Sequence, residues 1–166
     1  MPKTPKSKVP KKVPKRVDTK KVAKFDTRSR SFRLQHDSGP LIPNLVQNSM
    51  QYKEMYFGPW FLSCRVPDNY VYLADASIIV IENIIRNGHE DFIVGRKFSN
   101  KSNLFLFPLS SSSNYIFHVS EMSDSLEAFP LNNVKCKALK LPNFEGSGVV
   151  MDGTYAVFPI LMEENS

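Results

Sequence analysis

The sequence lacks the patterns on which most enzymes and metal proteins depend. It has two cysteines, Cys64 and Cys136, without a CxxC pair, and three histidines, none with a partner at metal-ligand spacing. A catalytic cysteine needs an electropositive niche with a base nearby, and a structural zinc site needs four grouped ligands. No glycine-rich phosphate loop is present either. We therefore expect a protein that is not an enzyme, with no catalytic residues, no metal site and no cofactor.

Long hydrophobic runs are also missing. The longest, around Ile78–Ile85, is interrupted by Glu82 and Asn83 and is far too short to cross a bilayer. The N-terminus begins with lysine and proline and contains no apolar segment of the secretory type. We expect no leader peptide, no membrane partner and a reducing compartment in which the two cysteines stay unpaired.

Charge is distributed unevenly along the chain. Residues 1–33 hold 13 Lys and Arg against 2 Asp, a net charge of +11, whereas the other 133 residues hold 9 Lys and Arg against 14 Asp and Glu, a net charge of −5. The first segment also has four prolines and few large apolar residues. Such a segment cannot bury enough surface to offset its ordering entropy, so it is predicted to be a disordered basic tail.

Two basic clusters with a short spacer lie within this tail. Their pattern is typical of a nuclear import signal and equally of an arm that contacts nucleic-acid phosphates. A tail that only increases solubility is the alternative. We predict nuclear localisation and contact with DNA phosphates through Lys11, Lys12, Lys15, Arg16, Lys20 and Lys21.

The rest of the chain is predicted to be mostly β, with a weak signal for one short helix in residues 43–56 of a linker at 34–58. Short β-branched and aromatic runs recur from Trp60 onward, and Asn87-Gly88 between two of them is a strong hairpin signal. Residues 77–85 also have isoleucines at near-helical spacing, but their β-branched content favours a strand. We predict a small twisted β-barrel at 59–162, followed by a tail at 163–166. The expected strands are 61–66, 70–73, 77–85, 91–98, 103–109, 115–120, 133–141 and 155–162.

Alternation in the run 133–141 predicts which side chains face the core. Val134, Cys136 and Ala138 are expected to point inward, and the three lysines of the run, Lys135, Lys137 and Lys140, to point outward. The serine run 110–113 is interpreted as a flexible loop.

Two stretches together resemble the bromo-adjacent homology (BAH) domain. "VYLADASIIVIENIIRNGHEDFIVGRKF" (71–98) is similar to the opening strands of that family, and "HVSEMSDSLEAFPLNNVKCKAL" (118–139) is similar to its last third. The resemblance covers roughly residues 60–142 and implies a closed β-barrel that docks on a histone tail, a nucleosome surface or a silencing or replication partner. The matching residues of the second stretch are Ser120, Glu121, Ser123–Ser125, Pro130, Val134, Lys135, Cys136 and Leu139.

Aromatic residues near these strands supply a candidate binding site. A cluster of rings can hold a methylated lysine by cation–π attraction, although most of the aromatics must be core. We expect such a site at Tyr70, Tyr72 and Phe98, with Glu121 or Asp124 as the acidic partner of a cation.

Three functions fit these patterns. The first is a nuclear, chromatin-associated interaction module, with the barrel on a histone or other nuclear protein and the tail on DNA. The second is an RNA or single-stranded nucleic-acid binder, in which bases stack on surface aromatics. The third is a structural subunit of a nuclear multiprotein complex. The patterns leave open the bound mark or partner, DNA against RNA, the oligomeric state, and a host against a viral or mobile-element origin.

Overall fold

The computed structural model describes residues 29–88, 90–144 and 150–160, with the backbone alone for 144, 150 and 151. The six basic residues predicted to serve import and DNA contact, from Lys11 to Lys21, lie outside the described residues, as does the predicted tail at 163–166.

The described chain consists of ten strands and three short 3-10 helices, which confirms the prediction of a mostly β body. The helices are η1 (Pro43–Leu45), η2 (Ser111–Asn114) and η3 (Leu131–Asn133). The strands are β1 (Arg30–His36), β2 (Ser49–Phe57), β3 (Trp60–Ser63), β4 (Tyr70–Leu73), β5 (Ile78–Asn87), β6 (Glu90–Asn103), β7 (Phe117–Met122), β8 (Glu127–Pro130), β9 (Val134–Phe144) and β10 (Val150–Ile160).

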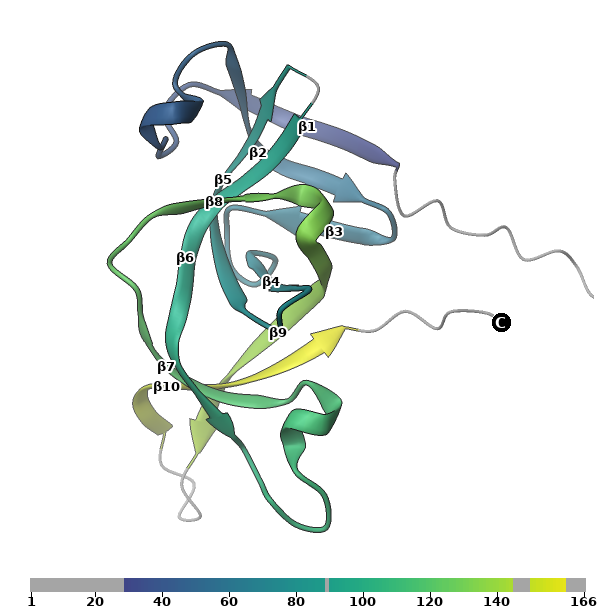
Figure 1. Ribbon diagram of the computed structural model, residues 1–166, viewed down its shortest axis with the longest axis vertical. Coiled ribbons are helices and arrows are strands. Elements are labelled where there is room, and N and C mark those ends of the chain that lie inside the picture. The colour runs from purple at the N-terminus through teal and green to yellow at the C-terminus, as the bar shows by residue number, and fades with distance from the viewer. Residues whose placement is uncertain (1–28, 89, 145–149, 161–166) are drawn as a thin grey trace, which may run out of the picture.

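Six of the strands form a closed ring. They pair in the order β5, β4, β9, β10, β7 and β6, and β6 pairs in turn with β5. Strand β2 extends the sheet from β5 and carries β1 and β3, while β8 lies along β6. In Figure 1 the strands β1 and β2 lie toward the top, and the connection from β6 to β7 projects at the bottom. The ring therefore lies between two ends of the molecule, one formed by β1 and β2 and the other by the connection from β6 to β7.

Strand β5 is the centre of the sheet because it pairs with β2, β4 and β6. Its residues from Ile78 to Ile81 are buried on both faces, which explains why the run is nearly continuous in isoleucine and valine. The predicted hairpin follows, with Asn87 opposite Glu90 and Gly88 at a φ of +63° that glycine adopts readily. The strand interpretation of residues 77–85 is confirmed.

The two faces of β5 contribute to two apolar clusters. Ile79 and Ile81 pack with Met55 and Leu62 beneath the β2–β3 extension. Side chains of the other face, from Ile78 and Val80, join a second cluster built from ring strands, with Tyr70, Tyr72, Phe117, Val119, Cys136, Ala138 and Val157. The second cluster confirms the inward orientation predicted for Cys136 and Ala138.

The segment predicted as a linker is part of the sheet. Strand β2 lies within residues 34–58, and the predicted short helix is reduced to the three residues of η1. The alternation in β2 buries Gln51, Met55 and Phe57 on one face, which fits a strand and not a helix.

The basic tail predicted for residues 1–33 ends earlier than expected. Residues 30–33 belong to β1, where the Phe32 ring lies 4.9 Å from that of Tyr52. A further difference concerns residues 103–109, because β6 ends at Asn103 and the rest of the predicted strand is a loop. Strand β8 was not predicted at all.

Candidate interaction surface

The connection between β6 and η2 exposes an unusual amount of apolar side chain. We call residues 104–109 the Phe107 loop. The exposed fractions are 43% for Phe105, 74% for Leu106, 88% for Phe107 and 68% for Leu109. Single exposed apolar residues are common on protein surfaces, but four gathered in one short loop indicate a binding surface.

A buried serine holds this loop in shape. The Ser111 hydroxyl oxygen accepts hydrogen bonds from the backbone N–H groups of Leu104 at 2.8 Å and Phe105 at 3.4 Å. In return the Ser111 N–H donates to the Phe105 carbonyl at 3.0 Å. Ser111 is fully buried. These contacts fix the first turn of the loop against its own end.

A second polar residue ties the serine run to β6. The Asn103 side-chain oxygen accepts from the Ser110 hydroxyl at 2.6 Å and from the Ser112 N–H at 3.0 Å. The Ser110 and Ser112 hydroxyls lie 2.7 Å apart. The interpretation of residues 110–113 as a flexible loop is therefore wrong, because the run is a hydrogen-bonded 3-10 turn.

Two lysines lie over aromatic rings of the chain that follows the loop and η2. The Lys101 Nζ lies 4.6 Å from the centre of the Phe117 ring and donates to the Ala76 carbonyl at 2.8 Å. The Lys135 Nζ lies 3.6 Å from the centre of the Tyr115 ring. Within the described residues neither lysine is in an ion pair with a carboxylate. The sequence from Phe92 to Ser120 contains no Asp or Glu, so the segment that carries the loop has only cationic and neutral residues.

One acidic residue, Asp75, approaches this region. Its pKa is lowered, mainly by the hydrogen bond that its carboxylate accepts from the Ser77 N–H at 2.9 Å, and to a smaller extent by the positive charge of Lys101. The Ser77 hydroxyl donates to the same carboxylate at 3.0 Å. The Asp75 carboxylate is thus bonded to Ser77 and does not form an ion pair with Lys101.

The predicted aromatic site is largely core. Tyr70 and Tyr72 are buried, and the Tyr72 hydroxyl donates to the carbonyls of Tyr115 at 2.7 Å and Val157 at 3.1 Å. Burial raises the pKa of Tyr72. These two tyrosines therefore cannot contact a partner, because β4 lies between β5 and β9 and the two rings are part of the second cluster.

Phe98 is the one predicted ring that reaches the surface. It is half-buried, with its ring 6.4 Å from that of Tyr155. Lys140 lies beside these rings, with Nζ 3.8 Å from the centre of the Tyr155 ring and 4.8 Å from that of Tyr70. The prediction that Lys140 points outward is wrong, because residues 136, 138 and 140 share one side of β9 and the Lys140 Nζ lies over two rings of the second cluster. The chain's own cation therefore lies over the Tyr155 and Tyr70 rings.

The two predicted acidic partners do not join the rings. Glu121 and Asp124 are exposed, and the backbone carbonyl of Asp124 accepts from Arg96 at 3.0 Å. Glu121 adjoins Met122, which pairs in register with Phe98. The structure thus places Glu121 near Phe98 along the strands but gives no cluster of all five residues.

The two cysteines are poor nucleophiles. Burial raises the pKa of the Cys64 thiol to about 11 and also raises the pKa of Cys136. Both thiols are therefore protonated at neutral pH. In the part of the chain that is described, no group of three or more His, Cys, Asp and Glu residues is placed to hold a metal ion. No described helix has the length and apolar character needed to cross a membrane.

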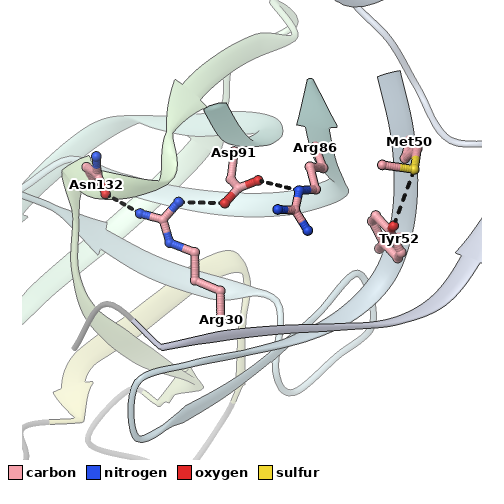
Figure 2. A network of polar contacts seen from close by, with 6 residues as sticks. All are labelled: Arg30, Met50, Tyr52, Arg86, Asp91 and Asn132. Atoms are coloured by element: carbon pink, nitrogen blue, oxygen red, sulfur yellow. Dashed lines mark hydrogen bonds and ion pairs between the residues drawn. The ribbon is translucent and has the colours of Figure 1, made fainter. Parts of the chain in front are cut away.

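At the opposite end of the molecule, where β1 begins, an ion-pair network links three strands. Figure 2 shows Arg30 of β1 reaching Asp91 and Asn132, with Arg86 on the other side of Asp91. Arg30 donates to the Asp91 carboxylate and to the Asn132 side-chain oxygen, both at 2.5 Å, and Arg86 lies 3.9 Å from the same carboxylate. Asp91 is buried. This network anchors the first described strand, and therefore the point where the basic segment joins the body.

The Phe107 loop is a candidate binding surface that the sequence analysis does not predict. Its apolar residues favour a strand, although Pro108 within the run and the flanking asparagine and serines indicate a loop. The fold and this surface together define a mostly β protein with a ring of strands and an apolar loop at one end. Residues 35–160 match the domain of unknown function DUF8592, and the chain belongs to that family. No curated protein and no solved structure matches it.

Proposed function

We propose that this protein is a nuclear, chromatin-associated interaction module without enzymatic activity. Its ring of strands binds a protein partner, either a histone or another nuclear protein. Its basic N-terminal segment carries the import signal and contacts DNA phosphates. The proposal requires no cofactor.

The observation that carries this proposal is the separation of charge between tail and body. Residues 1–33 carry +11 and the remaining residues −5. Four of the nine Lys and Arg residues in the body are in ion pairs with carboxylates: Arg86, Arg96, Lys97 and Lys137. Few body cations therefore remain for a polyanion, which leaves phosphate contact to the tail and protein contact to the body.

The BAH-like barrel belongs to the same proposal. The sequence stretch 71–98 that resembles the opening of the family supplies strands β4, β5 and most of β6. The second stretch, 118–139, supplies most of β7, all of β8 and the first part of β9, which lies between β4 and β10 in the ring. This order supports a closed barrel in which β9 is an integral strand. Methyl-lysine binding at Tyr70 and Tyr72 is not part of the proposal, since both rings are buried.

A salt titration of DNA binding tests the tail. We compare the full chain with a variant in which the six predicted tail residues, Lys11, Lys12, Lys15, Arg16, Lys20 and Lys21, are replaced by alanine. Each phosphate contact contributes about 0.9 to the slope of log affinity against log salt, so six lost contacts make the slope shallower by about 5. Fluorescence anisotropy with a labelled duplex measures both slopes.

The same pair of proteins tests nuclear import. Fused to a fluorescent reporter, the full chain should accumulate in the nucleus and the variant with six alanines should not. A matched control replaces Lys53, Arg65 and Lys97 of the body instead. Equal slopes and equal nuclear accumulation for all three proteins would remove the tail from the mechanism.

A single-stranded nucleic acid is the second candidate partner, supported by the half-buried Phe98 and Tyr155 rings beside Lys140. Bases stack on such rings where they are accessible. Repeating the titration with a single-stranded oligonucleotide separates phosphate contact by the tail from base stacking on the body. A Phe98→Ala variant weakens binding only if bases stack on the body.

A further inference from the structure

We propose that the Phe107 loop inserts into an apolar pocket with an acidic rim on a partner protein. This inference rests on the proposed function as an interaction module and specifies which surface binds and what the partner offers. A basic histone tail has neither property. The inference therefore selects, among the partners proposed above, a different nuclear protein.

The loop is pre-organised for insertion. Leu106, Phe107 and Leu109 have most of their side chains in solvent, yet the backbone beneath them is fixed by Ser111 and Asn103. A loop that is ordered before binding loses little entropy on binding, so more of the interaction energy appears as affinity. Natural sequences rarely maintain an ordered apolar loop in water without a function for it.

The backbone of the loop favours a protein over a lipid bilayer. Among the described residues, the N–H and C=O groups of Leu106 and Phe107 make no hydrogen bond within the chain. Hydrocarbon offers no partner to such groups, and each unsatisfied group there costs several kcal/mol. A pocket in a protein can supply donors and acceptors at its rim. The exposed backbone is therefore compatible with a protein pocket and unfavourable for deep insertion into lipid.

Charge at the base of the loop defines the rim of the pocket. Lys101 lies three residues before the loop, and Lys135 contacts Tyr115, the residue that directly follows η2. Each lysine is held over a ring and has no carboxylate partner in the described chain. When the loop is inserted, these two ammonium groups face the entrance of the pocket. Acidic residues at the entrance would complement them, increase the association rate and make binding sensitive to salt.

The same charges disfavour a second copy of this chain as the occupant. In a two-fold symmetric contact through the loop, each copy presents the same surface to the other. Lys101 and Lys135 of one copy would then approach those of its partner. Like charges brought together at an interface oppose association, so the loop fits a surface of opposite charge better than itself.

The experiment places a photo-crosslinking residue, p-benzoylphenylalanine, at position 107 of the full chain. Irradiation in a whole-cell extract is followed by mass spectrometry of the crosslinked peptides. Each captured protein is then purified and titrated by calorimetry with the wild type, with Phe107→Ser and with a Lys101→Glu and Lys135→Glu double variant. The control Val46→Ser removes an apolar side chain with 58% exposure from the other end of the molecule.

We expect one captured protein whose crosslinked peptide lies in an apolar site bordered by Asp or Glu. Phe107→Ser should weaken its binding about 10- to 100-fold, as expected for the loss of one buried aromatic side chain. The double lysine variant should weaken binding and reduce its salt dependence. Val46→Ser should bind like the wild type. Circular dichroism of every variant checks that the fold is retained.

Three results would overturn the inference. The first is that no captured protein binds Phe107→Ser more weakly than wild type. The second is binding to phosphatidylcholine–phosphatidylserine vesicles that Phe107→Ser abolishes. The third is self-association, measured by sedimentation, that the same variant abolishes. A partner from outside the nucleus would contradict the proposed function but support insertion of the loop into an apolar pocket with an acidic rim. Nuclear import with no partner at position 107 would do the reverse.

Discussion

The two ends of this molecule are held together by different chemistry. At the end where β1 begins, a buried carboxylate, Asp91, is paired with arginines from two other strands. At the opposite end, neutral hydrogen bonds from Asn103 and the serine run hold the Phe107 loop. The charged groups at the first end contact one another and Asn132. The neutral clamp at the second end uses only backbone and short side chains, which leaves the large apolar side chains free for a partner.

Removing Asp91 should have the largest effect on stability. Asp91→Ala leaves Arg30 and Arg86 without their carboxylate in a partly buried site. Breaking a buried ion pair costs about 3–5 kcal/mol, and because both arginines keep some solvent contact we expect about 2–3 kcal/mol here. Urea unfolding followed by tryptophan fluorescence measures the loss. Glu90→Ala, an exposed neighbour, should change stability by less than about 0.5 kcal/mol, and similar losses for the two variants would contradict this account.

The serine clamp should come next. Ser111→Ala removes the acceptor of the Leu104 and Phe105 N–H groups, and a buried donor left without a partner costs about 1–2 kcal/mol. The matched control is Ser113→Ala, since Ser113 is exposed and only its backbone joins the turn. Hydrogen exchange of the Leu104 and Phe105 amides reports the local effect. If both variants exchange these amides at the wild-type rate, the clamp does not order the loop.

The smallest effect should be at Asp75. Its pKa is lower in the folded chain than the ordinary value of 3.8, so its ionised form stabilises the fold above that pH, and this contribution is lost as pH falls through the folded-state pKa. Asp75→Asn should therefore cost on the order of 0.5 kcal/mol at neutral pH. The difference between variant and wild type should shrink in acid. A difference that is constant from pH 7 to pH 3 in thermal unfolding would exclude the charged form as the cause.

Local patterns predicted the parts of the fold that depend on neighbours in sequence. The Asn87-Gly88 turn and the isoleucine run of β5 define a hairpin by themselves, and alternation was sufficient to place Cys136 in the core. The basic segment could be delimited only by composition. Its boundary was misplaced because the pairing of Arg30 with Asp91, 61 residues away, cannot be read from a charge run.

The candidate site could not be predicted in the same way. Whether Tyr72 faces a partner or the core depends on β4 pairing with β9, a contact between distant segments. An apolar run such as 104–109 contains similar residue types whether it is a buried strand or an exposed loop. Pro108 is the local sign of a loop, and the hydrogen bonds of Ser111, which turn the chain back on itself, hold the run in that conformation.

The closed ring also determines where this chain can be extended by strand addition. A strand inside a ring has both neighbours in place and offers no free edge to another molecule. Among the described strands, only β1, β3 and β8 have a single partner strand. Strands β3 and β8 have four residues each, β8 ends in proline, and β1 carries two arginines and a left-handed residue at Leu34. Short, charged or interrupted edges resist intermolecular pairing, so a protein with an openly apolar loop is still protected against aggregation through its sheet.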